Sequence, residues 1–151
     1  MLNRLQGVFA SLNSHDVKYI VIGGIAAVLH GVPRATLDLD ILIESSSANA
    51  RRLLDALLDS QLATAELITP DQLIANEITV FNDRVRIDVQ TATPGIKFEE
   101  VWERRETMSF QGQPLFVLSA KDLIASKRAA GRSIDLEDAD TLDELISKND
   151  K

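Results

Sequence analysis

The order of hydrophobic and polar positions along the chain predicts strands that alternate with helices. Apolar residues recur with period two where a half-buried strand is expected, and at helical spacing elsewhere. The predicted strands span residues 17–22, 35–44, 77–81, 85–91, 107–110 and 114–118. The predicted helices span residues 2–12, 25–31, 45–61, 98–105, 120–130 and 134–147. A tight turn at Asn82-Asp83 joins two successive strands, so we expect a mixed α/β sheet and not a doubly wound parallel one.

Length and composition are those of one compact domain. The chain has 151 residues, of which 45% are hydrophobic, and no linker-like segment divides residues 1–151. It contains no cysteine, which excludes disulfides, thiolate zinc sites and cysteine nucleophiles. The first residues lack the long apolar run and cleavage site of a signal peptide, and the longest apolar stretch, residues 19–32, is interrupted and short. We therefore expect a cytoplasmic protein with no membrane partner.

The chain is acidic. Its formal net charge is −7 and its sequence pI is about 4.8. An acidic surface repels the phosphates of a duplex, so extended double-stranded nucleic acid is not an expected partner. A ligand whose negative charge is masked by magnesium remains compatible with this balance.

Two aspartates break the pattern of the strand predicted over residues 35–44. Alternation directs Leu37, Leu39 and Ile41 to the core and places Asp38 and Asp40 together on the opposite face. Aspartate is depleted in strands, and like charges that share a face repel each other. Such a double break of a local rule is typical of a functional site, although a solvated strand face also carries acids and an Asp-x-Asp motif alone is weak.

A third aspartate lies in a segment of the same construction. In the predicted strand 85–91, Asp88 lies on the polar face with Arg84 and Arg86. If this strand neighbours the first, three carboxylates converge and need a hard cation to offset their repulsion. Magnesium prefers oxygen ligands and commonly uses one or two carboxylates together with substrate phosphates.

A diglycine follows the first predicted strand. Gly23 and Gly24 would let the backbone approach a ligand closely at the start of a helix, where anions are favoured. The plain alternative is a tight strand-to-helix turn. The position favours a ligand, because Gly24 precedes Asp38 by the length of one short helix and a returning strand.

The segment GGIAAVLHGVPRATLDLDILI resembles the signature of the nucleotidyltransferase superfamily, whose members share a DNA-polymerase-β-like core. That signature is a diglycine or Gly-Ser, a short helix, Asp-x-Asp on a strand and a later third acid. Gly23, Gly24, Asp38, Asp40 and Asp88 match it. The features His30-Gly31 and RAT at 34–36, and the tail LSAKDLIASKRAAG, are similar to the branch that holds abortive-infection-type bacterial toxins and their small relatives.

The resemblance implies a mixed sheet with helices packed on one face, and a nucleotidyl transfer reaction. Asp38, Asp40 and Asp88 would be catalytic residues and would ligate two Mg²⁺ ions, or Mn²⁺ in their place. A nucleoside triphosphate such as ATP would be the substrate, with its phosphates held by Gly23 and Gly24. In that branch a helix carries a lysine toward the nucleotide, which here would be Lys121 or, preferably, Lys127.

Other residues have both a functional and a structural interpretation. Arg34 could clamp phosphate or pair with Asp38 or Glu44, and Thr36 could support Asp38 or simply begin a strand. His30 is more readily a capping or partly buried histidine than a catalytic one. The acidic residues at 135, 137, 138 and 140 suit the dipole of a helix N-terminus better than they suit a second metal site.

Two classes of function follow from these residues. The first is an enzyme that transfers a nucleoside monophosphate to a hydroxyl of RNA, of a protein or of a small molecule, within a toxin–antitoxin-like system. The second is a non-catalytic nucleotide-binding or partner-binding module of the same fold. The acid triad favours the enzyme, whereas the small size favours the module. A homodimer or a partner protein would cover the open side of the cleft.

Overall fold

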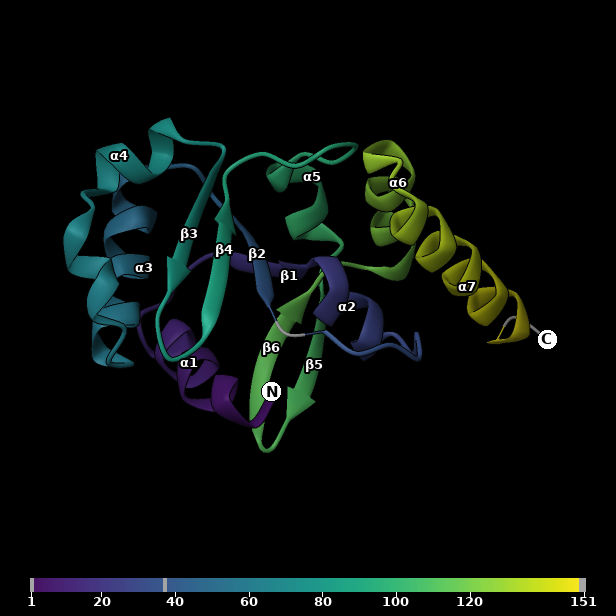
Figure 1. The fold of residues 1–151 in the computed structure, drawn as a ribbon, viewed down its shortest axis with the longest axis horizontal. Helices are drawn as coiled ribbons and strands as arrows, with labels where there is room; N and C mark the ends of the chain where they lie inside the picture. The colour runs from purple at the N-terminus through teal and green to yellow at the C-terminus, as the bar shows by residue number, and fades with distance from the viewer. Residues whose placement is uncertain (1, 37, 150–151) are drawn as a thin grey trace.

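The computed structural model describes residues 2–36 and 38–149, and within them six strands form one mixed sheet in the order β3-β4-β2-β1-β6-β5 (Figure 1). The strands are β1 (Tyr19–Ile22), β2 (Leu39–Ile43), β3 (Ile78–Asn82), β4 (Arg86–Gln90), β5 (Glu106–Phe110) and β6 (Gln113–Val117). The helices are α1 (Leu2–Ser14), α2 (Gly23–Leu29), α3 (Ser47–Asp59), the 3-10 helix η1 (Ala63–Leu67), α4 (Pro70–Ala75), α5 (Phe98–Glu103), α6 (Ala120–Ala130) and α7 (Ser133–Asn149). The expected mixed α/β sheet is confirmed.

The strand pairings explain why the sheet is mixed. β1 and β2 are joined by a short helix and pair antiparallel, and β3 and β4 form the predicted hairpin. β2 and β4 are parallel, as are β1 and β6, because helices and loops carry the chain across between them. The centre of the sheet is β2 with β1, and all four residues of β1 are buried.

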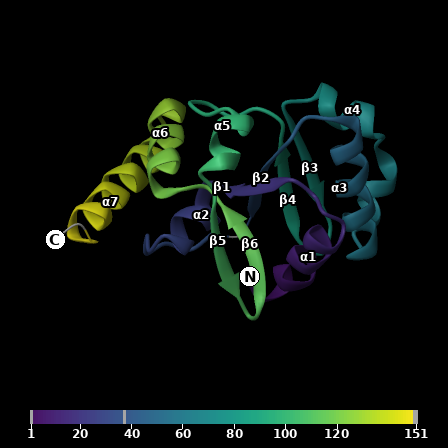
Figure 2. The same ribbon diagram turned by 180° about the vertical axis from the view of Figure 1, so that it is seen from behind.

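The core lies largely between the sheet and two helices. Leu39, Ile41 and Ile43 of β2 are fully buried, and so are apolar side chains on α1 and α3. The two helices pack against each other and on the sheet face opposite the aspartates, which the front and back views show (Figure 1, Figure 2). Burial of this face supplies the main driving force for folding, because each large apolar side chain contributes roughly 1.5–3 kcal/mol.

Helices α6 and α7 form a hairpin at the far end of the molecule. Gly131 ends α6 in a left-handed conformation, with φ of 75°, so the chain turns back at once into α7. The pair projects beyond the sheet, and α6 contacts α2 (Figure 1). α2 and α6 therefore stand on the sheet face that carries the aspartates. Among the described residues, no helix combines the length and apolar character that crossing a bilayer requires.

The strand predicted over 35–44 is shorter in the structure. β2 begins at Leu39, so Thr36 and Asp38 precede it, while Leu37 lies outside the described residues. The physical reason is pairing: Leu39 is the first residue opposite β4, and β1 ends opposite Asp40. Thr36 and Asp38, the described residues just before Leu39, have no strand partner.

Two helical elements between residues 61 and 77, η1 and α4, were not predicted. α4 begins at Pro70 behind a capping box, in which the Thr69 hydroxyl accepts from the Gln72 amide and the Gln72 side chain accepts from the Thr69 amide. The sequence TPDQ contains this signal, but the helix is only six residues long and has no full apolar period. The last helix also extends further than expected, to Asn149.

Asn49 links the residue before β1 to the residue after β2 through hydrogen bonds. Its side chain is fully buried on α3, where Oδ1 accepts from the amide of Lys18. Nδ2 donates to the carbonyls of Lys18 and Glu44. One side chain thus satisfies three backbone groups that lie just beyond the ladder.

Replacing Asn49 with alanine should lower the free energy of unfolding by roughly 2–4 kcal/mol, because the Lys18 amide and the Glu44 carbonyl lose this partner and the Lys18 carbonyl keeps only the Glu44 amide. Urea denaturation followed by circular dichroism measures the change. Arg51→Ala, on the exposed side of the same helix, is the control and should change stability by less than about 0.5 kcal/mol. Equal losses in the two variants would show that Asn49 has no such role.

Candidate active site

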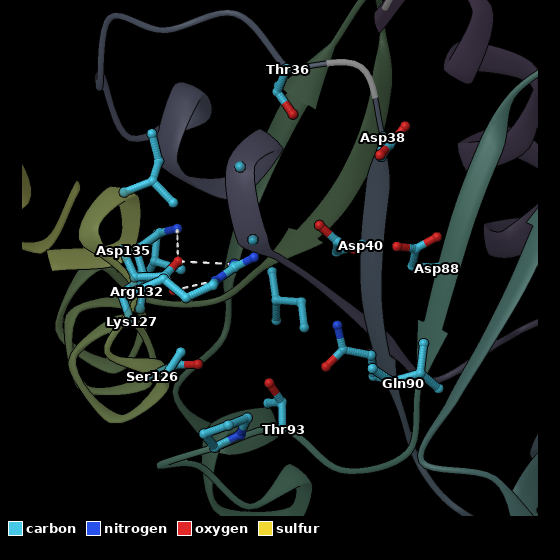
Figure 3. A pocket seen from close by; sticks show the side chains of 18 of the residues that line it. Thr36, Asp38, Asp40, Asp88, Gln90, Thr93, Ser126, Lys127, Arg132 and Asp135 are labelled. Atoms are coloured by element: carbon cyan, nitrogen blue, oxygen red, sulfur yellow. Dashed lines mark hydrogen bonds and ion pairs between the residues drawn. The ribbon is translucent and has the colours of Figure 1, made fainter. Parts of the chain in front are cut away.

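The pairing of β2 with β4 brings the acidic residues together. Asp40 lies directly opposite Asp88 in the parallel ladder, and Asp38 precedes β2 by one residue. Side chains of paired residues point to the same face of a sheet. The predicted adjacency of the two acidic strands is therefore confirmed, and all three carboxylates lie beside one another in Figure 3.

The same register explains the diglycine. Ile22, the last residue of β1, is opposite Asp40, so Gly23 begins α2 immediately beside the Asp40 side chain. Gly23 has φ of +69°, and a Cβ on it would come closer than 3.0 Å to Oδ2 of Asp40. A Cβ on Gly24 would lie 2.8 Å from Oγ1 of Thr36. Glycine is thus required here by the protein's own packing, and the backbone stays open toward the carboxylates.

Two arginines of β4 and its turn behave differently, although the sequence placed both with Asp88. Nε of Arg86 donates to Oδ1 of Asp88 at 3.0 Å, and its Nη2 lies 3.4 Å from Oδ2. The same Nε is 3.7 Å from Oδ2 of Asp38. Arg84 instead donates to the carbonyl of Ser60 at 2.6 Å. Of these two arginines, Arg86 is therefore the one that forms ion pairs with the acids.

Asp40 has the least favourable surroundings of the three acids. Burial is the largest cause that raises its pKa, and the neighbouring Asp88 carboxylate is the next. Together with a smaller contribution from Asp38 they raise the pKa of Asp40 from 3.8 to about 7, against a lowering by Lys127. A carboxyl that holds its proton so strongly is one that a bound cation would stabilise in its ionised form.

The carboxylates line a cavity of about 510 Å³, a size typical of small-molecule sites. Figure 3 shows Asp38, Asp40 and Asp88 along one wall and Lys127, Arg132 and Asp135 across from them. The glycine turn, Gln90, Thr93 and Ser126 also line it. The cavity therefore has an acidic wall from β2 and β4 and a cationic wall from α6 and the start of α7.

The cationic wall is a network of ion pairs. Lys127, whose side chain is only 6% exposed, lies 2.9 Å from Oδ2 of Asp138 and 3.7 Å from Oδ1 of Asp135. Arg34 also pairs with Asp138, and Nε of Arg132 donates to Asp135 at 2.7 Å. Arg132 accordingly lowers the pKa of Asp135, against the raising effect of burial. The network ties α6, α7 and the segment before β2 into one body.

This network corrects several expectations. Arg34 pairs with Asp138 and not with Asp38 or Glu44, because the loop before β2 runs toward α7. The acids at 135 and 138 act as ion-pair partners of cavity cations in addition to lying at the start of α7. Lys121 lies away from this cavity, whereas Lys127 lines it.

His30 has the structural role that was preferred. Its Nε2 lies 2.7 Å from the carbonyl of Leu118 and its side chain is 9% exposed. It is not among the residues that line the cavity. It connects the end of α2 to the end of β6.

Several residues that line the cavity were not predicted as part of the site, although Asp135 was assigned to the dipole of a helix N-terminus. Gln90 could have been found, because it follows Asp88 by two residues and so shares its face of β4. Arg132 and Asp135 could not, because only the turn at Gly131 brings α7 back to the cavity. Thr93 and Ser126 carried no local signal either.

The three acids do not form a complete cage of metal ligands. Within residues 2–36 and 38–149, no group of three His, Cys, Asp or Glu side chains is arranged as a set of metal ligands. Magnesium does not require such a cage, since it is commonly held by one or two carboxylates plus substrate phosphates. The all-oxygen donors of Asp40, Asp88 and Asp38, with the raised pKa of Asp40, fit magnesium in this manner.

Comparison with known families agrees with this geometry. Residues 3–149 match the family described as nucleotidyltransferase of unknown function, DUF6036. The chain belongs to this family. The match includes the diglycine, all three aspartates and both helices of the cationic wall. Membership in the nucleotidyltransferase superfamily, expected from the sequence, is thereby confirmed.

Solved structures share the fold. A candidate nucleotidyltransferase from Thermotoga maritima superimposes with a TM-score of 0.56 at 15% identity, over 97% of this chain and 92% of that one. An antigenic nucleotidyltransferase-like protein from Paracoccidioides brasiliensis gives a TM-score of 0.56 at 18% identity, over 91% of this chain and 72% of that one. Identities this low establish the common fold alone. No curated protein matches the sequence.

The raised pKa of Asp40 predicts a pH-dependent stability. The pKa is about 7 in the folded protein and 3.8 as the ordinary value, so the folded state binds the proton more tightly. The free energy of unfolding should therefore fall as pH rises from about 4 to about 7. Asp40→Asn removes this loss and should melt several degrees above the wild type at pH 8 but close to it at pH 4, since 1 kcal/mol corresponds to roughly 2–4 °C in a domain of this size.

Thermal melts in EDTA between pH 4 and pH 8 measure the effect. Glu66→Gln, at an exposed position of η1, makes the same change of charge and should leave the pH profile unaltered. Parallel profiles for wild type and Asp40→Asn would refute the raised pKa.

Proposed function

We propose that this protein transfers a nucleoside monophosphate from a magnesium-bound nucleoside triphosphate to an acceptor hydroxyl. The observation that carries the proposal is the placing of Asp40 opposite Asp88, with Asp38 beside them, on the wall of a cavity that faces three cationic side chains. Acids on one side suit metal ions, and cations on the other suit phosphates.

Asp38 and Asp40 would hold the magnesium ions, and Asp88 would complete the ligands of the ion nearest the acceptor. Magnesium bound there would supply charge neutralisation at the transferring phosphate and at the leaving pyrophosphate, in the manner of two-metal sites. Manganese could replace it, because it accepts the same oxygen ligands. Arg86, which now spans Asp38 and Asp88, would have to give up those oxygens.

The nucleotide would bind with its phosphates between the two walls. The backbone of Gly23 and Gly24 carries no side chain that would block a phosphate from the carboxylates. Lys127 and Arg34 supply positive charge from the opposite side, although both also contact Asp138. Catalysis would then consist mainly of positioning and of stabilising the charge that develops.

The reaction is a substitution at the α-phosphorus. The acceptor oxygen forms a bond to this phosphorus, the bond to the bridging oxygen of the pyrophosphate breaks, and pyrophosphate leaves with the electron pair. Asp88 would take the proton of the acceptor hydroxyl. RNA, a protein hydroxyl and a small molecule all supply such a group, and the resemblance to abortive-infection-type toxins favours a toxin–antitoxin setting.

A second function is a non-catalytic module that binds a nucleotide or a partner. The observation that favours it is the pairing of Lys127, Arg34 and Arg132 with Asp135 and Asp138, which reduces the positive charge available to phosphates. Such a module could act as a homodimer or with a partner protein that covers the cavity.

Calorimetric titration with ATP in the presence of Mg²⁺ tests the metal–nucleotide site. The wild type should bind, and the double variant Asp38→Asn with Asp40→Asn should lose at least about tenfold in affinity, because removing two carboxylates removes the metal's protein ligands. Binding should also tighten from pH 6 to pH 8 as Asp40 loses its proton. The double variant Glu99→Gln with Glu100→Gln is the control, because it removes the same number of negative charges outside the cavity.

Equal binding by wild type and the aspartate double variant would refute the metal site. If the wild type alone binds, incubation with α-phosphorus-labelled triphosphates and cell extract distinguishes the two functions. The transferase predicts a labelled acceptor that the aspartate variant does not produce. The module predicts binding without any transfer of label.

A further inference from the structure

Arg86 spans two of the three carboxylates. Its Nε donates to Oδ1 of Asp88 at 3.0 Å, and the same nitrogen lies 3.7 Å from Oδ2 of Asp38. Its Nη2 reaches the second oxygen of Asp88 at 3.4 Å. The guanidinium therefore donates to both oxygens of Asp88 and forms an ion pair with Asp38, and these interactions raise the pKa of Arg86 itself.

The position of this side chain follows from β4. Arg86 and Asp88 are two residues apart in one strand, so they share a face, and the parallel neighbour β2 brings Asp38 to the same place. Among the described residues, the ion pairs of Arg86 are with Asp38 and Asp88 alone. Its side chain is 45% exposed, so the guanidinium has direct access to solvent.

The other cations of the cavity are held differently. Lys127 is 6% exposed, and its partners Asp135 and Asp138 are each 4% exposed, so that network is a fixed part of the fold. Asp135 and Asp138 also lie on α7 and belong to the opposite wall. Arg86 is thus the cavity cation that is both weakly held and paired to the acids of β2 and β4.

We propose that Arg86 is an exchangeable counter-ion that competes with the divalent metal for Asp38 and Asp88. It neutralises the acids in the metal-free protein and withdraws when a cation takes their oxygens. The competition sets the metal affinity low enough for the metal to arrive with its nucleotide. This inference rests on the proposed function, because it assumes that the three aspartates bind the metal.

Both the occupied oxygens and the charge of Arg86 oppose a divalent cation. A carboxylate oxygen that accepts from a guanidinium must give up that hydrogen bond before it ligates a metal, and the positive charge repels the metal over a few ångströms. Removing the side chain removes both effects. The metal should then bind more tightly, which is opposite to the usual result of removing a residue from an active site.

Titration of the full chain with Mn²⁺ alone, followed by the electron paramagnetic resonance signal of free Mn²⁺, tests this competition without any nucleotide or activity. Arg86→Ala and Arg86→Gln should each lower the dissociation constant by about 3–10-fold relative to wild type. Arg84→Ala is the matched control, since it removes an arginine close to Arg86 whose partner is the Ser60 carbonyl. It should bind Mn²⁺ as the wild type does. The glutamine variant keeps most of the side-chain volume, so it guards against a folding defect.

The outcomes separate this inference from the proposed function. Tighter binding in both Arg86 variants but not in Arg84→Ala supports the exchange. Unchanged or weaker binding in the Arg86 variants overturns it, while loss of binding in Asp38→Asn with Asp40→Asn still upholds the metal site. Absence of Mn²⁺ binding in every protein overturns both. Equal tightening by Arg84→Ala also overturns the exchange, because it would reflect net charge alone.

Discussion

The parallel pairing of β2 with β4 forces like charges together, and the rest of the site is arranged around that repulsion. Asp40 and Asp88 are directly opposite in the ladder, so neither can move away without breaking the sheet. The pairing is maintained because the other face of the same strands is fully buried under α1 and α3. Apolar burial on one face thus holds an electrostatically unfavourable cluster on the other, where burial and the neighbouring Asp88 carboxylate raise the pKa of Asp40 to about 7.

The protein offsets this repulsion at two levels. Arg86 lies close to the acids and is half exposed, whereas Lys127 stands across the cavity, buried and paired with Asp138 and Asp135, and the exposed Arg132 pairs with Asp135 beside it. The buried network has all its charges paired, which a buried charge requires. A triphosphate with magnesium would complement both walls at once, since its metal suits the acids and its phosphates suit the cations.

Much of this site could be predicted from the sequence, because its main signals are local. Period-two alternation placed Asp38 with Asp40 and marked Asp88, and the diglycine marked the close approach beside them. The predicted beginning of β2 was wrong. The apolar–polar alternation continues back to residue 35 in the sequence, but the neighbouring strands pair with β2 only from Leu39 onward. α4 was missed because a helix of six residues shows only its capping box and no full apolar period.

The sequence by itself determined which residues share a strand face, because alternation depends only on neighbours along the chain. Only the tertiary structure decided which faces meet, since β2 and β4 are brought together by distant segments. Only the tertiary structure also decided which of Arg84 and Arg86 pairs with the acids, and which residues pair with Lys127. Two arginines of equal chemistry in one hairpin differ because one faces Asp88 and the other the Ser60 carbonyl. Such differences arise from non-local packing, which periodicity does not encode.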